Sequence, residues 1–175
     1  VVAPGSVHPL VKAMSDAALA AGTGPMSAVA GAMAEYICRD LLAELSAEEV
    51  VVENGGDIFM KLAAPATVAV YAGESPLSEK IALRPVAADT PLALCCSSGT
   101  VGHSLSFGVA DACMIACRDG ALADAYATAF CNEVKDKTMA RQVTEKAAST
   151  AGILSAVIIT GDQVSMGGSI EIKIL

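Results

Sequence analysis

Asp124 and Thr128 lie four residues apart in an alanine-rich segment, residues 121–129. In a helix this spacing places both side chains on one face, and a carboxylate beside a hydroxyl suits Mg²⁺, a cation that prefers oxygen ligands. In the alternative interpretation, Asp124 complements the helix dipole in the first turn and Thr128 is solvated. The pair is therefore a candidate metal site, and the spacing alone leaves both interpretations open.

A glycine turn is the second candidate for ligand binding. It comprises Asn54, Gly55, Gly56 and Asp57 and separates two predicted strands. Glycines permit positive φ and let a ligand approach the backbone closely. A tight hairpin turn is the simpler explanation, because Asn-Gly is its usual signal, and the turn alone favours that explanation.

The third candidate is the polar segment 96–106. Its glycines, hydroxyl residues and histidine are Ser97, Ser98, Gly99, Thr100, Gly102, His103, Ser104 and Ser106. Successive N–H groups in glycine-rich turns form anion-binding nests, and a histidine there could act as acid, base or hydrogen-bond donor to a phosphate. The alternative is a polar surface loop, but its position directly after an apolar strand favours function.

Cysteine usage indicates free thiols. The six cysteines are Cys38, Cys95, Cys96, Cys113, Cys117 and Cys131. Four of them lie in apolar, patterned segments, so buried thiols in a reducing cytoplasm are expected rather than disulfides. An alternative function is thiol chemistry at Cys95 or Cys96, with His103 as the activating base. Strand alternation predicts that one of the two adjacent thiols is in the core and the other is exposed.

Composition restricts the class of protein. The 175 residues are 54% hydrophobic and 3% aromatic, with 11 Lys+Arg against 19 Asp+Glu and a net charge of -8. This composition excludes disorder and makes nucleic-acid binding improbable. Apolar runs are too short to span a bilayer, and no signal peptide is visible, so we expect a cytoplasmic protein without a membrane partner. An acidic chain must hold a phosphorylated ligand through local backbone dipoles or a metal ion.

The periodicity predicts one α+β domain over residues 1–175, with a largely antiparallel sheet and helices packed on one face. Because the chain begins at Val1, we expect N-terminal residues of a longer protein to be missing. The sequence leaves open whether the protein forms a homo-oligomer. In the helix after Pro25, the predicted apolar stripe is Met26, Val29, Ala30, Met33, Ile37, Leu41 and Leu45. Helices are predicted over 11–21, 25–45, 121–132 and 139–150. Strands are predicted over 50–52, 58–62, 67–71, 80–86, 92–96, 112–117, 156–160 and 169–175.

Five strings, taken in chain order, resemble an uncharacterised family within the ApbE-like superfamily: segments 24–26, 53–58, 71–78, 97–108 and 121–128. The string Ser-Ser-Gly-Thr-Val-Gly-His-Ser is the most specific of them. The resemblance implies an ApbE-like (T-fold-like) fold. The superfamily includes flavin transferases, which move FMN from FAD onto a protein threonine using Mg²⁺.

The resemblance also implies roles for particular residues. Asp124 and Thr128 match the superfamily's metal site, to which a backbone carbonyl near Gly24 would contribute. The 54–57 turn is similar to the one beside the flavin nucleotide, and Asp57 and His103 are the candidate catalytic residues. The leading hypothesis is a Mg²⁺-dependent protein that binds or transfers FAD, FMN or another phosphorylated ligand. The alternatives are the thiol protein and a non-catalytic binding protein that keeps the fold.

Overall fold

The computed structural model describes residues 7–102 and 106–175. Its helices are α1 (Pro9–Ala21), α2 (Val29–Leu45), α3 (Gly120–Glu133) and α4 (Ala140–Ser149), with short 3₁₀ helices at Pro25–Ala28, Ala87–Asp89 and Lys137–Met139. Its strands are β1 (Val50–Asn54), β2 (Asp57–Lys61), β3 (Val68–Ala69), β4 (Ile81–Leu83), β5 (Leu92–Ser97), β6 (Ala112–Cys117), β7 (Ile153–Thr160), β8 (Gln163–Gly168) and β9 (Ile172–Ile174).

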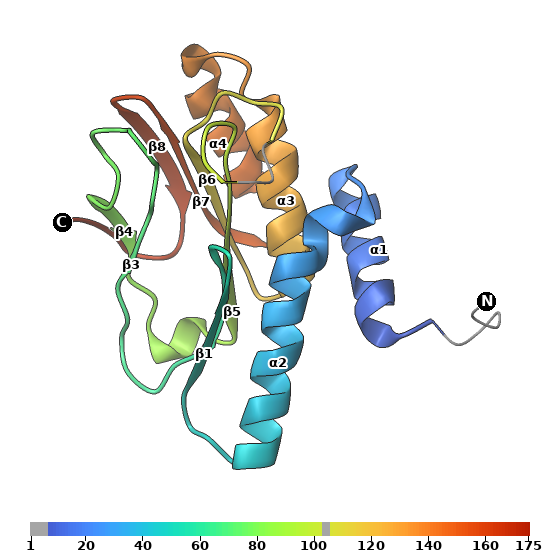
Figure 1. Cartoon of the computed structure of the whole chain (residues 1–175). Helices are drawn as coiled ribbons and strands as arrows, with labels where there is room; N and C mark the ends of the chain where they lie inside the picture. The colour runs from blue at the N-terminus through green and yellow to red at the C-terminus, as the bar shows by residue number, and fades with distance from the viewer. Residues whose placement is uncertain (1–6, 103–105) are drawn as a thin grey trace.

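The strands form two antiparallel sheets. The larger has the order β1-β2-β5-β6-β7-β8, and the smaller has the order β3-β4-β9. The helices lie together on one side of the large sheet, and the small sheet lies on the other (Figure 1). This arrangement confirms the predicted α+β class with helices on one face.

Strand alternation gives the large sheet two apolar faces. On β5, Ala93 and Cys95 belong to the core beneath the helices, whereas Leu92 and Leu94 belong to the core beneath the small sheet. Successive side chains of a strand point to opposite faces, so a strand buried on both sides must be continuously apolar. β5 and β6 meet this requirement, and they form the centre of the molecule.

The apolar stripe predicted for the helix after Pro25 is not its buried face, although the helix itself forms. α2 instead buries small residues and one glutamate: Gly31, Ala32, Ala34, Glu35 and Cys38. Met33, Ile37 and Leu41 are exposed. The reason is the close approach of α2 to α3, where Gly31 and Gly120 meet backbone to backbone. Larger side chains do not fit there, so they occupy the outer face.

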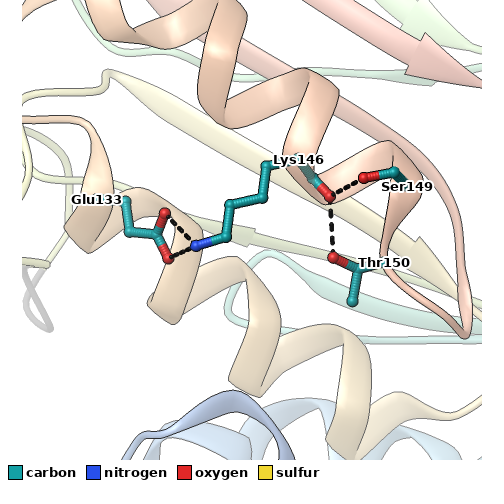
Figure 2. A network of polar contacts seen from close by, with 4 residues as sticks. All are labelled: Glu133, Lys146, Ser149 and Thr150. Atoms are coloured by element: carbon teal, nitrogen blue, oxygen red, sulfur yellow. Dashed lines mark hydrogen bonds and ion pairs between the residues drawn. The ribbon is translucent and has the colours of Figure 1, made fainter.

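Polar contacts join α3 to α4 at the end remote from this crossing (Figure 2). Lys146 Nζ lies 2.8 Å from both carboxylate oxygens of Glu133. The carbonyl oxygen of Lys146 accepts hydrogen bonds from the hydroxyls of Ser149 and Thr150, at 2.9 Å each. The ion pair is exposed, so we expect it to contribute less than about 1 kcal/mol to stability.

The C-terminal strands differ from the prediction. A single strand was expected over 169–175, but β8 covers Gln163–Gly168 in the large sheet and β9 covers Ile172–Ile174 in the small one. Over residues 7–102 and 106–175, no single helix has the length and apolar character needed to cross a membrane. The helical segments 9–21 and 25–45, which are bent by 107° relative to each other, reach the length and apolar composition of a membrane span only when they are counted together.

Candidate functional site

A cavity of about 580 Å³ lies where the start of α2, the β1–β2 turn, the end of β5 and the middle of α3 meet. Residues of all three candidate segments line it: Asn54, Gly55, Gly56, Asp57, Cys96, Ser97, Ser98, Gly102, Ser106, Asp124 and Thr128. The three candidate segments therefore converge on one space. His103 lies outside the described residues.

The β1–β2 turn is fixed by its own side chains. Gly55 and Gly56 have φ of 67° and 103°, values that favour glycine. Glu53 Oε1 accepts the Gly56 N–H at 2.6 Å, and the Asn54 side chain donates to the Ala30 carbonyl of α2 at 3.2 Å. Asp57 then begins β2, and its Oδ1 accepts the Cys96 N–H from β5 at 3.0 Å. The hairpin explanation and the binding explanation are thus compatible.

On α3, the carboxylate and hydroxyl face the cavity together. Asp124 Oδ2 accepts the N–H of Gly31 at 2.9 Å, so the α2–α3 crossing sets its position. The Thr128 hydroxyl lies 3.0 Å from that of Ser97. A buried carboxylate and a hydroxyl one helical turn apart are oxygen donors, and this donor set fits Mg²⁺.

Loop 97–102 uses much of its hydrogen-bonding capacity internally. Ser98 Oγ accepts the N–H groups of Thr100 at 3.0 Å and of Val101 at 2.9 Å, and the Gly99 N–H donates to the Ala110 carbonyl at 2.9 Å. The Thr100 hydroxyl donates to Asp111 at 2.8 Å. Of the segment Gly99 to Gly102 in which the anion nest was predicted, Val101 and Gly102 line the cavity, whereas Gly99 and Thr100 lie outside its lining.

Gly24 also lies outside the cavity lining. Its carbonyl accepts both the N–H of Ser27, at 3.0 Å, and the Ser27 hydroxyl, at 2.8 Å. From this part of the chain, the cavity is lined by Met26, Ser27, Val29 and Ala30. A role for the Gly24 carbonyl in binding a metal stays a prediction.

Asp57 and Asp124 are buried and electrostatically linked. The pKa of Asp57 is raised to about 7, mainly by burial and secondly by the negative charge of Asp124. Burial also raises the pKa of Asp124, to about 6, against the opposing effect of N–H groups from Gly31 and Ala30. Two neighbouring carboxylates out of water disfavour double ionisation. A bound cation would relieve this repulsion.

We expect the metal-free protein to lose stability as the pH rises from about 4 to about 7. Raised carboxyl pKa values mean that the folded state binds more protons than the unfolded state in this window. The stability that these two carboxyl groups contribute is therefore complete below the ordinary aspartate pKa of 3.8. It is lost as the pH rises through their raised pKa values in the folded protein, about 6 and about 7. Urea denaturation at several pH values in a chelator measures the slope. Asp57→Asn should flatten it, and an unchanged slope in this variant would contradict the assignment.

The two adjacent cysteines differ in environment. Cys95 is fully buried on the helix side, and its thiol donates to the Gly120 carbonyl at 3.7 Å; Cys96 is part-buried and lines the cavity. Burial raises the pKa of Cys96 to about 12, and the pKa of Cys95 is also well above its usual range. All six cysteines are free, as predicted. Protonated thiols are poor nucleophiles, so the described residues around Cys95 and Cys96 do not activate either thiol.

The cavity also has an apolar part, which was not predicted from the sequence. Ile58, Val68, Ala69, Tyr71, Val101 and Met114 line it. Apolar side chains carry no sign of chemistry in a sequence, and only strand register places them here. Ile58, Tyr71 and Val101 are exceptions, because they lie in strings that carried the family resemblance.

The fold is an α+β fold in which an antiparallel six-stranded sheet is covered by helices on one face (Figure 1). The crystal structure of the Pseudomonas stutzeri flavinyl transferase ApbE in its apo form has the same fold. The two superpose with a TM-score of 0.53 and 15% identity, over 95% of this chain and 59% of that one. A family model described as "AbpE bacteria" matches residues 2–164, and the chain belongs to that family.

Curated relatives of this chain include three UPF0280 proteins. The Methanosphaerula palustris protein is 40% identical over 161 residues, which are 92% of this chain and 66% of that protein. The Methanothrix thermoacetophila protein is 38% identical over 162 residues, 93% of this chain and 67% of that protein. The Methanospirillum hungatei protein is 46% identical over 123 residues, which are 70% of this chain and 50% of that protein. The chain thus spans half to two thirds of the length of these relatives.

Proposed function

We propose that this protein binds Mg²⁺ through Asp124 and Thr128 and, together with the cation, a phosphorylated nucleotide, with FAD or FMN as the first candidates. The observation that carries the proposal is the convergence of the α3 pair, the 54–57 turn and Ser97–Ser98 on one cavity. The cation would supply positive charge for phosphate oxygens. The fold resemblance to a flavinyl transferase supports a flavin as the nucleotide.

The charges around the cavity support a requirement for a cation. Its described lining contains two carboxyl groups and no lysine, arginine or histidine. An anionic ligand would be repelled by Asp57 and Asp124 unless a cation neutralised them. Ile58, Val68 and Tyr71 line the apolar part, which suits an uncharged aromatic ring.

Transfer of FMN is the finer part of the proposal. The pyrophosphate bond of FAD would break, the FMN phosphate would join an acceptor hydroxyl, and AMP would leave. The hydroxyl proton needs an acceptor, for which Asp57 and His103 are the candidates. A carboxyl with a pKa near 7 suits proton transfer at neutral pH.

Titration of FAD, FMN and ADP, with Mg²⁺ and with a chelator, tests the proposal. We expect heat or a fluorescence change in Mg²⁺ and binding at least about tenfold weaker in the chelator, since buried carboxylates oppose the anion. Absence of binding by all three nucleotides to the folded protein would contradict the function. Release of AMP from FAD then distinguishes transfer from binding alone.

A further inference from the structure

We propose that Ser97 is a positioning residue for the cation site, acting through Thr128. Its hydroxyl accepts the hydrogen of the Thr128 hydroxyl and so turns a lone pair of Thr128 Oγ1 toward the cation. The inference rests on the proposed function, because it concerns the same cation. Ser97 is the last residue of β5, Thr128 is on α3, and their hydroxyl oxygens are 3.0 Å apart.

The hydroxyl of Thr128 has an unusual partner for a helical threonine. Such hydroxyls commonly bond the carbonyl four residues earlier in the helix. Thr144 follows this pattern on α4, donating to Ala140 at 2.8 Å, and Ser15 follows it on α1, donating to Val11 at 2.9 Å. The hydroxyl of Thr128 instead bonds the side chain of Ser97 on a neighbouring strand. Its oxygen is therefore aimed at the cavity edge, which both residues line.

Counting donors and acceptors assigns a direction to this bond. A hydroxyl has one hydrogen and two acceptor lone pairs. When Thr128 Oγ1 gives a lone pair to a cation, its hydrogen must point away from the positive charge and needs an acceptor. Ser97 Oγ is in place to accept it. The hydrogen of Ser97 is then left to point into the cavity, where it can donate to an anionic ligand oxygen.

Packing between β5 and α3 does not depend on this bond. Ala93 and Cys95 of β5 and Ala123 and Ala127 of α3 belong to the same buried core. Ser97 lies at the end of the strand and is only part-buried. Ser97→Ala should therefore fold normally and reveal the role of the hydroxyl in cation binding.

The test measures Mn²⁺ affinity from the electron paramagnetic resonance signal of the free ion, with Mn²⁺ as the probe for a hard divalent site. We expect Ser97→Ala to weaken binding about tenfold, as loss of an orienting partner of a metal ligand does. Ser15→Ala removes a helical serine hydroxyl away from the cavity and is the matched control.

A double variant separates positioning from direct ligation. In the Thr128→Val background, Ser97→Ala should cause no further loss, because Ser97 acts through the Thr128 hydroxyl. An equal loss in both backgrounds, or an unchanged affinity in Ser97→Ala alone, would overturn the inference while leaving the proposed function standing. A wild-type protein that binds no Mn²⁺ or Mg²⁺ would overturn both. Thermal unfolding of each variant confirms that the protein used is folded.

Discussion

Replacing Asp124 with asparagine is expected to reduce Mg²⁺ affinity by at least about 100-fold, because the site loses its charged ligand. The change is nearly isosteric, and the asparagine side-chain oxygen can still accept the N–H of Gly31 that Asp124 accepts at 2.9 Å. The α2–α3 crossing should therefore persist. Calorimetric titration of Mg²⁺ into wild type and variant measures the effect, and nucleotide binding should fall with it.

The same variant has an opposite effect on stability. Removing one charge from the buried Asp57–Asp124 pair ends the repulsion between them, so the metal-free variant should be more stable than the wild type at pH 8. Asp16→Asn is a matched control, because Asp16 lies on α1 and its carboxylate pairs with exposed Lys12. Retained Mg²⁺ affinity in Asp124→Asn would remove Asp124 from the cation site.

Gly31→Ala is expected to destabilise the fold by about 3 kcal/mol, the upper end of the usual cost of overpacking. An added Cβ would lie 2.8 Å from Asp124 Cβ and 3.0 Å from Cys95 Sγ, and closer still to the Gly120 carbonyl oxygen. The Gly120 backbone cannot rotate away as a side chain can, so α2 and α3 must separate. Urea denaturation measures the loss in free energy of unfolding.

Gly24→Ala is the control for this substitution. Its Cβ would meet nothing within 4 Å, and its φ of -86° is ordinary for alanine. We expect its stability to remain within about 0.5 kcal/mol of the wild type, as for most surface changes. Equal stability of the two variants would show that the helix crossing tolerates a methyl group. Because the Gly31 N–H bonds to Asp124, Gly31→Ala should also weaken cation binding.

The sequence allowed α2 to be predicted as a helix but not its orientation. Residues Met33, Ile37 and Leu41 form a regular apolar stripe, and such a stripe usually faces the core. Here a glycine-mediated contact with α3 selects small residues for the buried face. Close packing of backbones depends on the partner helix, which the periodicity of one helix does not reveal.

The sheet shows a similar division. Continuous apolar runs identified β5, β6 and β7, whereas Gln163–Gly168, which is polar and glycine-containing, was missed as β8. β8 is a strand because it pairs with residues Ser155 to Thr160 of β7. Such pairing depends on the partner strand and cannot be deduced from the residues of β8 alone. Likewise, the apolar wall at Val68 and Tyr71 exists because a second sheet lies beside the first.

Chemical residue types were the more reliable guide to the candidate site. Asp124, Thr128 and the 54–57 turn reach one cavity, since helix spacing and glycine turns are local features. The anion nest predicted around Gly99 to Gly102 needed free backbone N–H groups, including those of Gly99 and Thr100. Ser98 and Ala110 accept those hydrogens instead, and neither partner could be deduced from glycine content.

The acidic floor of the cavity has a practical consequence for identifying its natural ligand. If the cavity holds the proposed cation, protein purified in buffers that strip divalent ions presents Asp57 and Asp124 unshielded, and libraries of phosphorylated metabolites screened against it would return false negatives. Co-purifying compounds would be washed away in the same step. Screening should therefore begin with Mg²⁺ present from cell lysis onward.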